Sequence, residues 1–410
     1  MENVCVIITF RISKKSAGGN QMKVFLSDLH IGLGNESDDF IYDDRLIKLL
    51  RDLDDENNEL FIVGDFFELS NLINDGLMMD TASEYAEKFD PSLIDTIFAS
   101  HEKMIEELRK FSKKHNIYYI AGNHDYYILL NQKINEKIKE AFENCEILPY
   151  YYDPNLRLFV IHGNQFDIVN RLSKDKDGNL IPPFAEYMNK YMNYNFGKVA
   201  GKILPAELYS DYQNIYPQLD VFKWLDIIKE KYDLNYNLKN KWIETFTQLI
   251  KTPQVKKWMK INFPGVNILS NIFVNNLGGM KLGEAIVRVG MFFRSMRNSN
   301  SLLMKAEELL NDKFYIPKEY LIGFYDQDIS FAKGEIKGIV MGHNHRASFN
   351  IIKNGGSKEV YINTGTWKFM VNRNFGINRN EFIKKKLISY LLIDDSNKSM
   401  NFKLVREEAF

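Results

Sequence analysis

The sequence predicts an α/β fold in which a largely parallel sheet is interrupted by a large, mainly helical insertion. Five short apolar runs end abruptly in polar turns, and helical patterns at 43–53 and 92–113 lie between the early runs. Strands that alternate with helices form β-α-β units with a parallel sheet. The composition changes between about residues 170 and 330, where three of the four tryptophans lie within long helical patterns.

The five apolar runs are rich in Val, Ile, Phe and Tyr, as buried strands are. Because the carboxyl ends of parallel strands meet at one edge of a sheet, the polar clusters that follow them should gather there. Lys23–Leu26 precedes Asp28 and His30, Leu60–Val63 precedes Asp65, Ile117–Ile120 precedes Asn123 and His124, Leu158–Ile161 precedes His162, and Ile336–Met341 precedes His343 and His345.

Four segments are expected along the chain. They are an N-terminal extension (1–21), the first part of the core (22–169), a mainly helical insertion that forms a cap or lid (170–330), and the second part of the core (331–410). The second part should be completed by strands at Val360–Asn363, Leu387–Ile393 and Asn401–Val405.

The N-terminal extension has an apolar run, Val4–Phe10, that precedes its basic residues. A secretory signal has the reverse order, so a signal peptide is rejected. We expect residues 1–21 to be dispensable, with Met22 as an alternative start. The competing interpretation is an additional edge strand at Val4–Ile12.

The composition excludes several classes of protein. Over 410 residues the net charge is −1, which gives no global signal for nucleic acid. Two cysteines exclude a disulfide framework and a thiolate metal cluster, and they fit a reducing compartment. No apolar run approaches the roughly 18 residues of a membrane span. A cytoplasmic location is therefore expected.

The histidines indicate a metal site, because five of the seven follow predicted strands. Two-metal hydrolysis requires carboxylate oxygens, neutral imidazoles and an oxygen ligand shared by both ions. Each residue alone has an ordinary explanation: Asp28 as a helix cap, Asp65 in a turn, His162 as a core histidine. Together, and in this order, they favour a metal centre formed by Asp28, His30, Asp65, Asn123, His162, His343 and His345.

These motifs resemble those of the calcineurin-like metallophosphoesterase superfamily over residues 22–170 and 331–370. The resemblance is carried by Asp28-x-His30, Gly64-Asp65, Gly122-Asn123-His124-Asp125, His162-Gly163 and Gly342-His343-x-His345. Residues 361–367 also resemble the strand and turn that follow the last motif in that family. The resemblance implies a four-layer α-β-β-α sandwich and a hydrolase of phosphoester or pyrophosphate bonds with two divalent cations, which are Mn, Fe or Zn.

The resemblance also implies a role for each site residue. Asp65 would bridge the two ions, and His124 would donate a proton to the leaving oxygen. Asp125 would orient His124 or cap a helix. Asp28, His30 and His345 would bind the first ion, and Asn123, His162 and His343 the second.

The segment from Gly64 to Leu69 is similar to the UDP-2,3-diacylglucosamine pyrophosphatase branch, which cleaves a pyrophosphate in lipid A synthesis and has a helical insert that holds acyl chains. The segments 28–32 and 343–346 agree with this resemblance. Glu68 and Arg346 would then contact the substrate, although Glu68 alone is equally well explained as a surface or helix-start residue. Two residues depart from the branch: His124, where many members have arginine, and Ser70, where tryptophan is frequent. The insertion is also far longer.

The composition of the insertion fits more than one kind of binding partner for the protein. From Phe222 to Asn300 there are 13 Lys and Arg against 5 Asp and Glu, a local balance of +8. Apolar faces at Phe263–Val274 and Ala285–Phe293 could contact an anionic lipid or the inner face of a membrane. The same features suit single-stranded nucleic acid, or an ordinary helical subdomain. The basic residues beside these faces are Arg288, Arg294 and Arg297.

Three functions compete. The favoured one is hydrolysis of a phosphorylated small molecule or a lipid-linked nucleotide. The second is a nuclease or cyclic-nucleotide phosphodiesterase on the same core. The third is a non-catalytic binding module, which is disfavoured because every predicted ligand and His124 are present.

Overall fold

The computed structural model describes most of the chain. The described residues are 4–10, 22–35, 38–54, 58–72, 75–217, 220–263, 300–311, 315–316, 329–330, 336–354, 356–374, 381–394 and 401–409. The apolar faces expected within 263–274 and 285–293, together with Arg288, Arg294 and Arg297, lie outside these residues apart from Phe263.

The core consists of two β-sheets. The first has the order β1-β18-β17-β2-β3-β4-β5, with β16 beside β17 and β10 beside β16, and the second has the order β14-β15-β13-β7-β6. The strands of the first sheet are β1 (Val4–Phe10), β2 (Met22–Leu26), β3 (Glu59–Val63), β4 (Asn116–Ile120), β5 (Cys145–Leu148), β10 (Ile215–Tyr216), β16 (Phe369–Arg373), β17 (Phe382–Asp394) and β18 (Asn401–Ala409). Those of the second are β6 (Tyr151–Asp153), β7 (Leu158–Val160), β13 (Gly338–Met341), β14 (Ser348–Asn354) and β15 (Ser357–Asn363).

The parallel character that the sequence predicts holds at the centre of each sheet. Strands β2 to β5 are mutually parallel, and β13 is parallel to both β7 and β15. Most flanking pairs, including β17 with β2 and β14 with β15, are antiparallel. The five strands that carry the motifs therefore run parallel to their motif-bearing neighbours, and the three strands expected near the C-terminus are confirmed as β15, β17 and β18.

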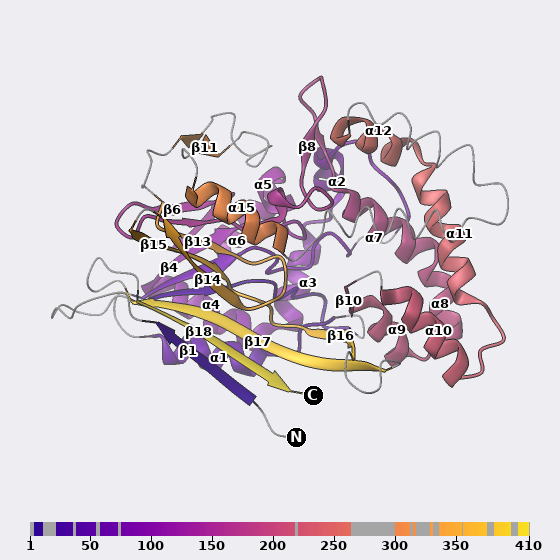
Figure 1. Ribbon diagram of the computed structural model, residues 1–410, viewed down its shortest axis with the longest axis horizontal. Coiled ribbons are helices and arrows are strands. Elements are labelled where there is room, and N and C mark those ends of the chain that lie inside the picture. The colour runs from indigo at the N-terminus through magenta and orange to yellow at the C-terminus, as the bar shows by residue number, and fades with distance from the viewer. Residues whose placement is uncertain are drawn as a thin grey trace.

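Four layers follow from the alternation of side chains along the strands. In β2, Val24 and Leu26 pack in one core with helices α1 (Asp43–Asp52) and α4 (Glu102–Lys114). Phe25 lies in a second core between the two sheets, where it stacks on Phe61 with ring centroids 4.5 Å apart. The outer face of the second sheet packs against α15 (Asn300–Asn311), which completes the predicted α-β-β-α sandwich (Figure 1).

The insertion contributes to the core as well as to a separate helical group. Helix α15 lies within the range 170–330, yet it forms the fourth layer. Strand β10 extends the first sheet through β16. The other insertion helices gather at one side of the sandwich (Figure 1). They are α7 (Phe184–Asn195), α8 (Gly197–Ile203), α9 (Ala206–Gln213), α10 (Val221–Lys231), α11 (Leu238–Ile250) and α12 (Pro253–Asn262).

The aromatic residues of this helical group form its core. Trp224, Trp242 and Trp258 are at most 3% exposed, and Trp258 lies against Phe184 with ring centroids 5.2 Å apart. These three indoles are therefore not available to stack on a nucleic acid. In the described part of the insertion, the tryptophans fit the interpretation of an ordinary helical subdomain.

The remaining elements are short. They are α2 (Ala82–Lys88), α3 (Ser92–Ser100), α5 (Tyr127–Leu130), α6 (Gln132–Ala141), the 3₁₀ turn η1 (Asn164–Phe166), and the strand pairs β8 (Ser173–Lys174) with β9 (Leu180–Ile181) and β11 (Tyr315–Ile316) with β12 (Ile329–Ser330).

The N-terminal residues form an edge strand. Strand β1 pairs antiparallel with β18 along its whole length, from Val4 opposite Glu408 to Phe10 opposite Phe402. The edge-strand interpretation is thereby confirmed, whereas the dispensability of residues 1–21 stays a prediction. Among the described residues, no helix is both long and apolar enough to cross a bilayer.

Candidate metal centre

The loops that follow the five motif strands interlock through their backbones. The Asp28 amide donates to the Gly64 carbonyl at 3.0 Å, and the Gly342 amide donates to the His162 carbonyl at 3.0 Å. These bonds join segments that are far apart in the sequence. The polar clusters thus meet at one edge of the sandwich, as the sequence predicts.

The backbone of these loops is strained at the predicted ligands. Such conformations cost about 1–3 kcal/mol per residue and persist where the surroundings compensate, often at functional sites. Of the seven described non-glycine residues with positive φ, five are predicted ligands: Asp28 (55°), His30 (53°), Asp65 (52°), His343 (70°) and His345 (56°).

Two glycines allow the loops to approach this closely. A Cβ at Gly122 would overlap the Asp65 carboxylate, and one at Gly64 would overlap the His162 ring. Gly64 also has a φ of 81°, in the left-handed region that favours glycine. Neither position has room for a larger side chain.

The first group of candidate ligands contains Asp28, His30 and His345. The two Nε2 atoms of His30 and His345 lie 3.4 Å apart, and His345 Nε2 lies 3.1 Å from Asp28 Oδ1. His30 donates its Nδ1–H to Glu68 Oε2 at 2.8 Å, so its lone pair is on Nε2. The three ligand atoms converge on one point.

The second group contains Asp65, His162 and His343. His162 donates Nδ1–H to the Val63 carbonyl at 2.7 Å, which leaves Nε2 directed at Asp65 Oδ2, 3.1 Å away. The same Asp65 oxygen lies 4.0 Å from His30 Nε2 in the first group. Asp65 therefore lies between the two groups.

Three buried ligand atoms form no regular hydrogen bond among the described residues, although two of them lie 3.1 Å from another candidate ligand atom. They are Asp28 Oδ1, Asn123 Oδ1 and His162 Nε2. A buried polar atom without a partner costs about 1–3 kcal/mol, and such atoms are rare in native structures. All three belong to predicted ligands, and their lone pairs are what a divalent cation would satisfy. The donor set of carboxylate, amide oxygen and imidazole fits Mn, Fe or Zn.

The electrostatics of the centre favour a bound cation. Burial lowers the pKa of His30 and of His345, so both are neutral as ligands must be. Burial alone would also lower the pKa of His162, but the Asp65 and Asp28 carboxylates outweigh it and raise the pKa to about 10. The two buried carboxylates therefore favour positive charge at this position, which a metal ion would supply.

Glu68 connects the first group to His124. Its Oε1 accepts from His124 Nδ1 at 2.7 Å while its Oε2 accepts from His30, so both carboxylate oxygens are used within the site. Burial opposes the charged form of His124, but the carboxylates of Glu68 and Asp65 raise the pKa of this imidazole to about 9. Glu68 therefore positions two histidines. This role differs from the contact with substrate that the sequence analysis predicts for it.

Asp125 differs from both expectations for it. It makes no hydrogen bond to His124 in the described structure and caps no helix. Its carboxylate accepts from the Phe66 amide at 2.9 Å, the Tyr119 hydroxyl at 2.7 Å and the Gly122 amide at 2.6 Å. Asp125 thus ties together the loops after β3 and β4.

Asp167 was missed by the sequence analysis. Its Oδ2 lies 3.1 Å from His343 Nε2, so it holds that ring with Nδ1 free for the second group. Asp167 is five residues after His162. This short distance from a motif histidine was the one signal in the sequence for its role. Lys368 was also missed: its Nζ lies 3.1 Å from Asp39 Oδ2, and it lines the same cleft as His30.

Arg346 lies outside the centre. It is exposed, and its guanidinium lies over the Tyr216 ring, 5.2 Å from the centroid. Tyr216 in turn lies against His345, with ring centroids 6.4 Å apart. The expected contact of Arg346 with substrate stays a prediction.

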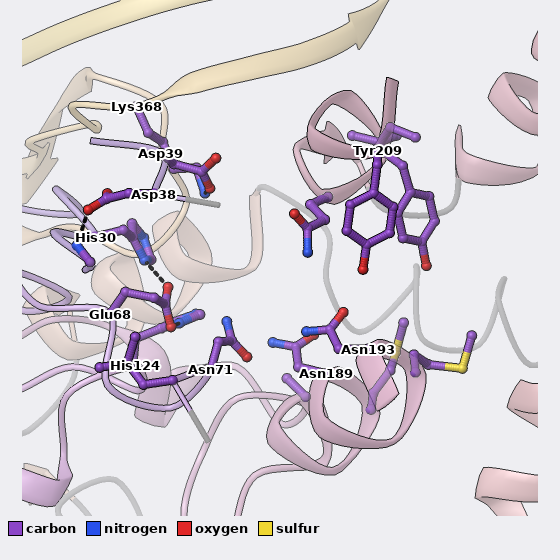
Figure 2. Close-up of a pocket in the computed structure, with 18 of the residues that line it drawn as sticks. His30, Asp38, Asp39, Glu68, Asn71, His124, Asn189, Asn193, Tyr209 and Lys368 are labelled. Carbon is purple, nitrogen blue, oxygen red and sulfur yellow. Dashed lines mark hydrogen bonds and ion pairs between the residues drawn. The ribbon is translucent and has the colours of Figure 1, made fainter. Parts of the chain in front are cut away.

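A cleft of about 470 Å³ opens in front of His30, Glu68 and His124. Figure 2 shows these three side chains at one end of the cleft and Tyr209 of α9 at the other, with Asn71, Asn189 and Asn193 between them. One wall is formed by the motif loops and the other by the helical group. His124 and the insertion helices therefore line the same cleft.

Comparison with known proteins agrees with this geometry. No curated protein matches the sequence. One family model does, and its match ends before His343, His345 and the insertion helices that form the opposite wall of the cleft. Residues 24–180, which contain the first four motifs, match the model of the calcineurin-like phosphoesterase family.

Proposed function

We propose that this protein hydrolyses phosphodiester or pyrophosphate bonds with the aid of two divalent cations. The observation that carries the proposal is the set of three buried ligand atoms, on Asp28, Asn123 and His162, that form no regular hydrogen bond among the described residues. They lie among residues with a strained backbone, which is frequent at functional sites. The family match over 24–180 gives the same reaction class.

Each ion would have its own ligands, with Asp65 shared. Asp28, His30 and His345 would hold the first ion, and Asn123, His162 and His343 the second. When bound, such ions neutralise phosphoryl charge and lower the pKa of an attacking water. Glu68 and Asp167 would orient His30 and His343 through the ring nitrogens that face away from the ions.

His124 would protonate the leaving oxygen. Its Nδ1–H is held by Glu68, so the proton available for transfer is on Nε2. Because the pKa of His124 is raised to about 9, the ring carries this proton at neutral pH. Lys368 would supply a positive charge to a phosphoryl oxygen, since its ammonium faces the same cleft.

The charge of the cleft favours a small phosphorylated substrate over a nucleic acid. Of the described residues that line it, Lys368 is the one Lys or Arg, and Asp38, Asp39 and Glu68 are acidic. A groove that follows a polynucleotide backbone needs several cations. A lipid-linked nucleotide such as UDP-diacylglucosamine stays a candidate, as does contact of the insertion with a membrane.

The test is hydrolysis of bis(p-nitrophenyl) phosphate by metal-free protein to which Mn²⁺, Fe²⁺ or Zn²⁺ is returned. We expect activity with at least one of them, and a loss of about 100-fold or more in Asp65→Asn and His124→Gln. Asp44→Asn, on the exposed face of α1, is the matched control and should keep wild-type activity. Wild-type protein that is inactive with every ion would refute the proposal and favour a binding module.

A further inference from the structure

One face of α7 forms part of the cleft wall opposite the metal centre. Met188, Asn189, Met192 and Asn193 are one helical turn apart in pairs, so they share that face, and all four line the cleft. Asn71, from the loop that follows Glu68, lines the cleft beside them (Figure 2). Amides thus face the space directly in front of His124.

The side of α7 next to these asparagines is anchored to the motif loops. Lys190 is 3% exposed and donates to the Ser70 carbonyl at 2.7 Å, two residues from Glu68. Glu186 is 4% exposed and accepts from the hydroxyls of Tyr126, at 2.6 Å, and Tyr127. Because these contacts are buried, the distance between the Asn-bearing face and the Glu68–His124 pair is set by the fold.

The amides on this wall are not used by the protein itself. Within the described residues, the side chains of Asn189 and Asn193 make no hydrogen bond to the protein. The Oδ1 atom of Asn71 is buried and has no partner there either. By contrast, Asn195, at the end of the same helix, donates to the Tyr191 carbonyl at 3.0 Å and does not line the cleft.

The chemistry of the wall selects an uncharged ring with several polar groups. An amide both donates and accepts, so a set of them matches hydroxyls or ring amides, and Met188 and Met192 beside them provide apolar contact. Tyr209 and Tyr212, nearly parallel with centroids 6.1 Å apart, line the cleft beyond the amides and offer aromatic faces to such a ring. The volume of about 470 Å³ accommodates one phosphorylated ring.

We propose that the α7 face, with Asn71, is a subsite for a nucleoside or glycosyl group joined to the phosphorus that is cleaved. The proposal rests on the hydrolase function proposed above, because it places the ring in contact with the amides while the phosphoryl group is at the metal centre. Asn189 and Asn193 would determine which phosphodiesters are used, without taking part in the reaction.

The test compares substrates that share the phosphoryl group and differ in the ring. They are the p-nitrophenyl phosphodiesters of thymidine and of glucose, and bis(p-nitrophenyl) phosphate, which has neither a nucleoside nor a glycosyl group. The variants are Asn189→Leu, Asn193→Leu and the double variant, with Asn195→Leu as the matched control on the same helix. Leucine keeps the branched shape and the number of side-chain heavy atoms and removes the hydrogen bonds.

We expect each single variant to raise the KM for the preferred ring-bearing substrate about tenfold, which is the loss of one buried hydrogen bond. The kcat/KM for bis(p-nitrophenyl) phosphate should change less than about twofold, and Asn195→Leu should behave as wild type. The preferred ring distinguishes a nucleoside from a glycosyl subsite. Equal effects on all three substrates, or no effect on any, would overturn the proposal.

Failure of the hydrolase function would be visible separately, as wild-type protein that cleaves none of the three substrates. The subsite is then tested by calorimetric binding of thymidine 5′-phosphate and glucose 1-phosphate. Weaker binding of one of them to the Asn189→Leu and Asn193→Leu variants than to wild type and Asn195→Leu supports the subsite. Equal binding to all four proteins, or no binding to wild type, refutes it.

Discussion

Replacing Lys190 with methionine should destabilise the protein, because the ammonium joins α7 to a motif loop and to a buried carboxylate. Its Nζ lies 2.7 Å from the Ser70 carbonyl, 3.8 Å from Glu186 Oε1 and 4.8 Å from the centroid of the Tyr85 ring. Methionine retains the length and apolar stem of lysine and removes the charge and the donors. The perturbation is therefore confined to these polar contacts.

The magnitude follows from what the substitution leaves behind. A hydrogen bond from a charged donor contributes about 1.5–3 kcal/mol, and removing one member of a buried ion pair costs about 3–5 kcal/mol. Glu186 keeps its bonds from two tyrosine hydroxyls, which offsets part of that cost. We therefore expect a loss of about 3 kcal/mol in the free energy of unfolding at pH 8.

The loss should shrink at lower pH. Burial already raises the pKa of Glu186, and the Lys190 ammonium opposes that rise. Without the ammonium the pKa rises further above the unfolded value. A carboxyl with a raised folded-state pKa destabilises the protein at pH values above it, and protonation relieves the cost as the pH falls. The deficit of Lys190→Met should therefore be smaller at pH 5 than at pH 8.

Urea unfolding of wild type, Lys190→Met, Glu186→Gln and the double variant measures this coupling. The double variant should be less destabilised than the sum of the single variants by at least about 1 kcal/mol, because it leaves no unpaired charge. A cost below about 1 kcal/mol for Lys190→Met, or additive single effects, would refute the reasoning.

Three further predictions concern other parts of the structure. Burial opposes the charge on His101, but Asp38 and Asp43 raise the pKa of this imidazole to about 9. The charged ring therefore stabilises the folded protein fully below the pKa of His101 in the unfolded chain, and this contribution is lost as the pH rises through 9. His101→Gln should therefore cost about 2 kcal/mol in urea unfolding at pH 6 and clearly less at pH 10, and a cost that does not depend on pH would contradict the assignment. Mn²⁺ at about 100 times its dissociation constant should stabilise the wild type by about 2.7 kcal/mol in thermal or urea unfolding, and Asp65→Asn should lose this increment. Equal stabilisation of both proteins would exclude Asp65 as a ligand. Asp167→Asn should weaken metal affinity about 10- to 100-fold in a competition with a chromogenic chelator, since it would loosen the His343 ring. Unchanged affinity would show that the Asp167 contact does not orient His343 for metal binding.

Much of the site could be predicted because its parts are local in the sequence. An apolar run followed by Asp-x-His or Gly-Asn-His indicates a strand and the loop at its carboxyl end within a few residues. The partners of those residues could not be predicted in the same way. Glu68 was noticed through its motif, yet its bonds to two imidazoles depend on the register of β2, β3 and β4.

The structure of the insertion could also be predicted from the sequence only in part. Its helical character follows from periodicity, but the pattern did not indicate that α15 would cover the second sheet or that β10 would extend the first. It also did not indicate which face of α7 would be directed at the metal centre. Polar residues occur on adjacent sides of this helix, and the buried contacts of Glu186 and Lys190 decide which side lines the cleft.

The sequence by itself determined the α/β class, the order of the motif strands and the set of candidate ligands, because each depends on short-range patterns of apolar and polar residues. Only the tertiary structure decided that Asp65 lies between two ligand groups and that Asp167 and Glu68 hold the rings of His343 and His30. It also decided that amides of α7 lie across a cleft from His30 and Glu68. The physical reason is distance along the chain. Val160 and Val340 are neighbours only because β7 and β13 pair, and that pairing depends on burying the two sheets against each other.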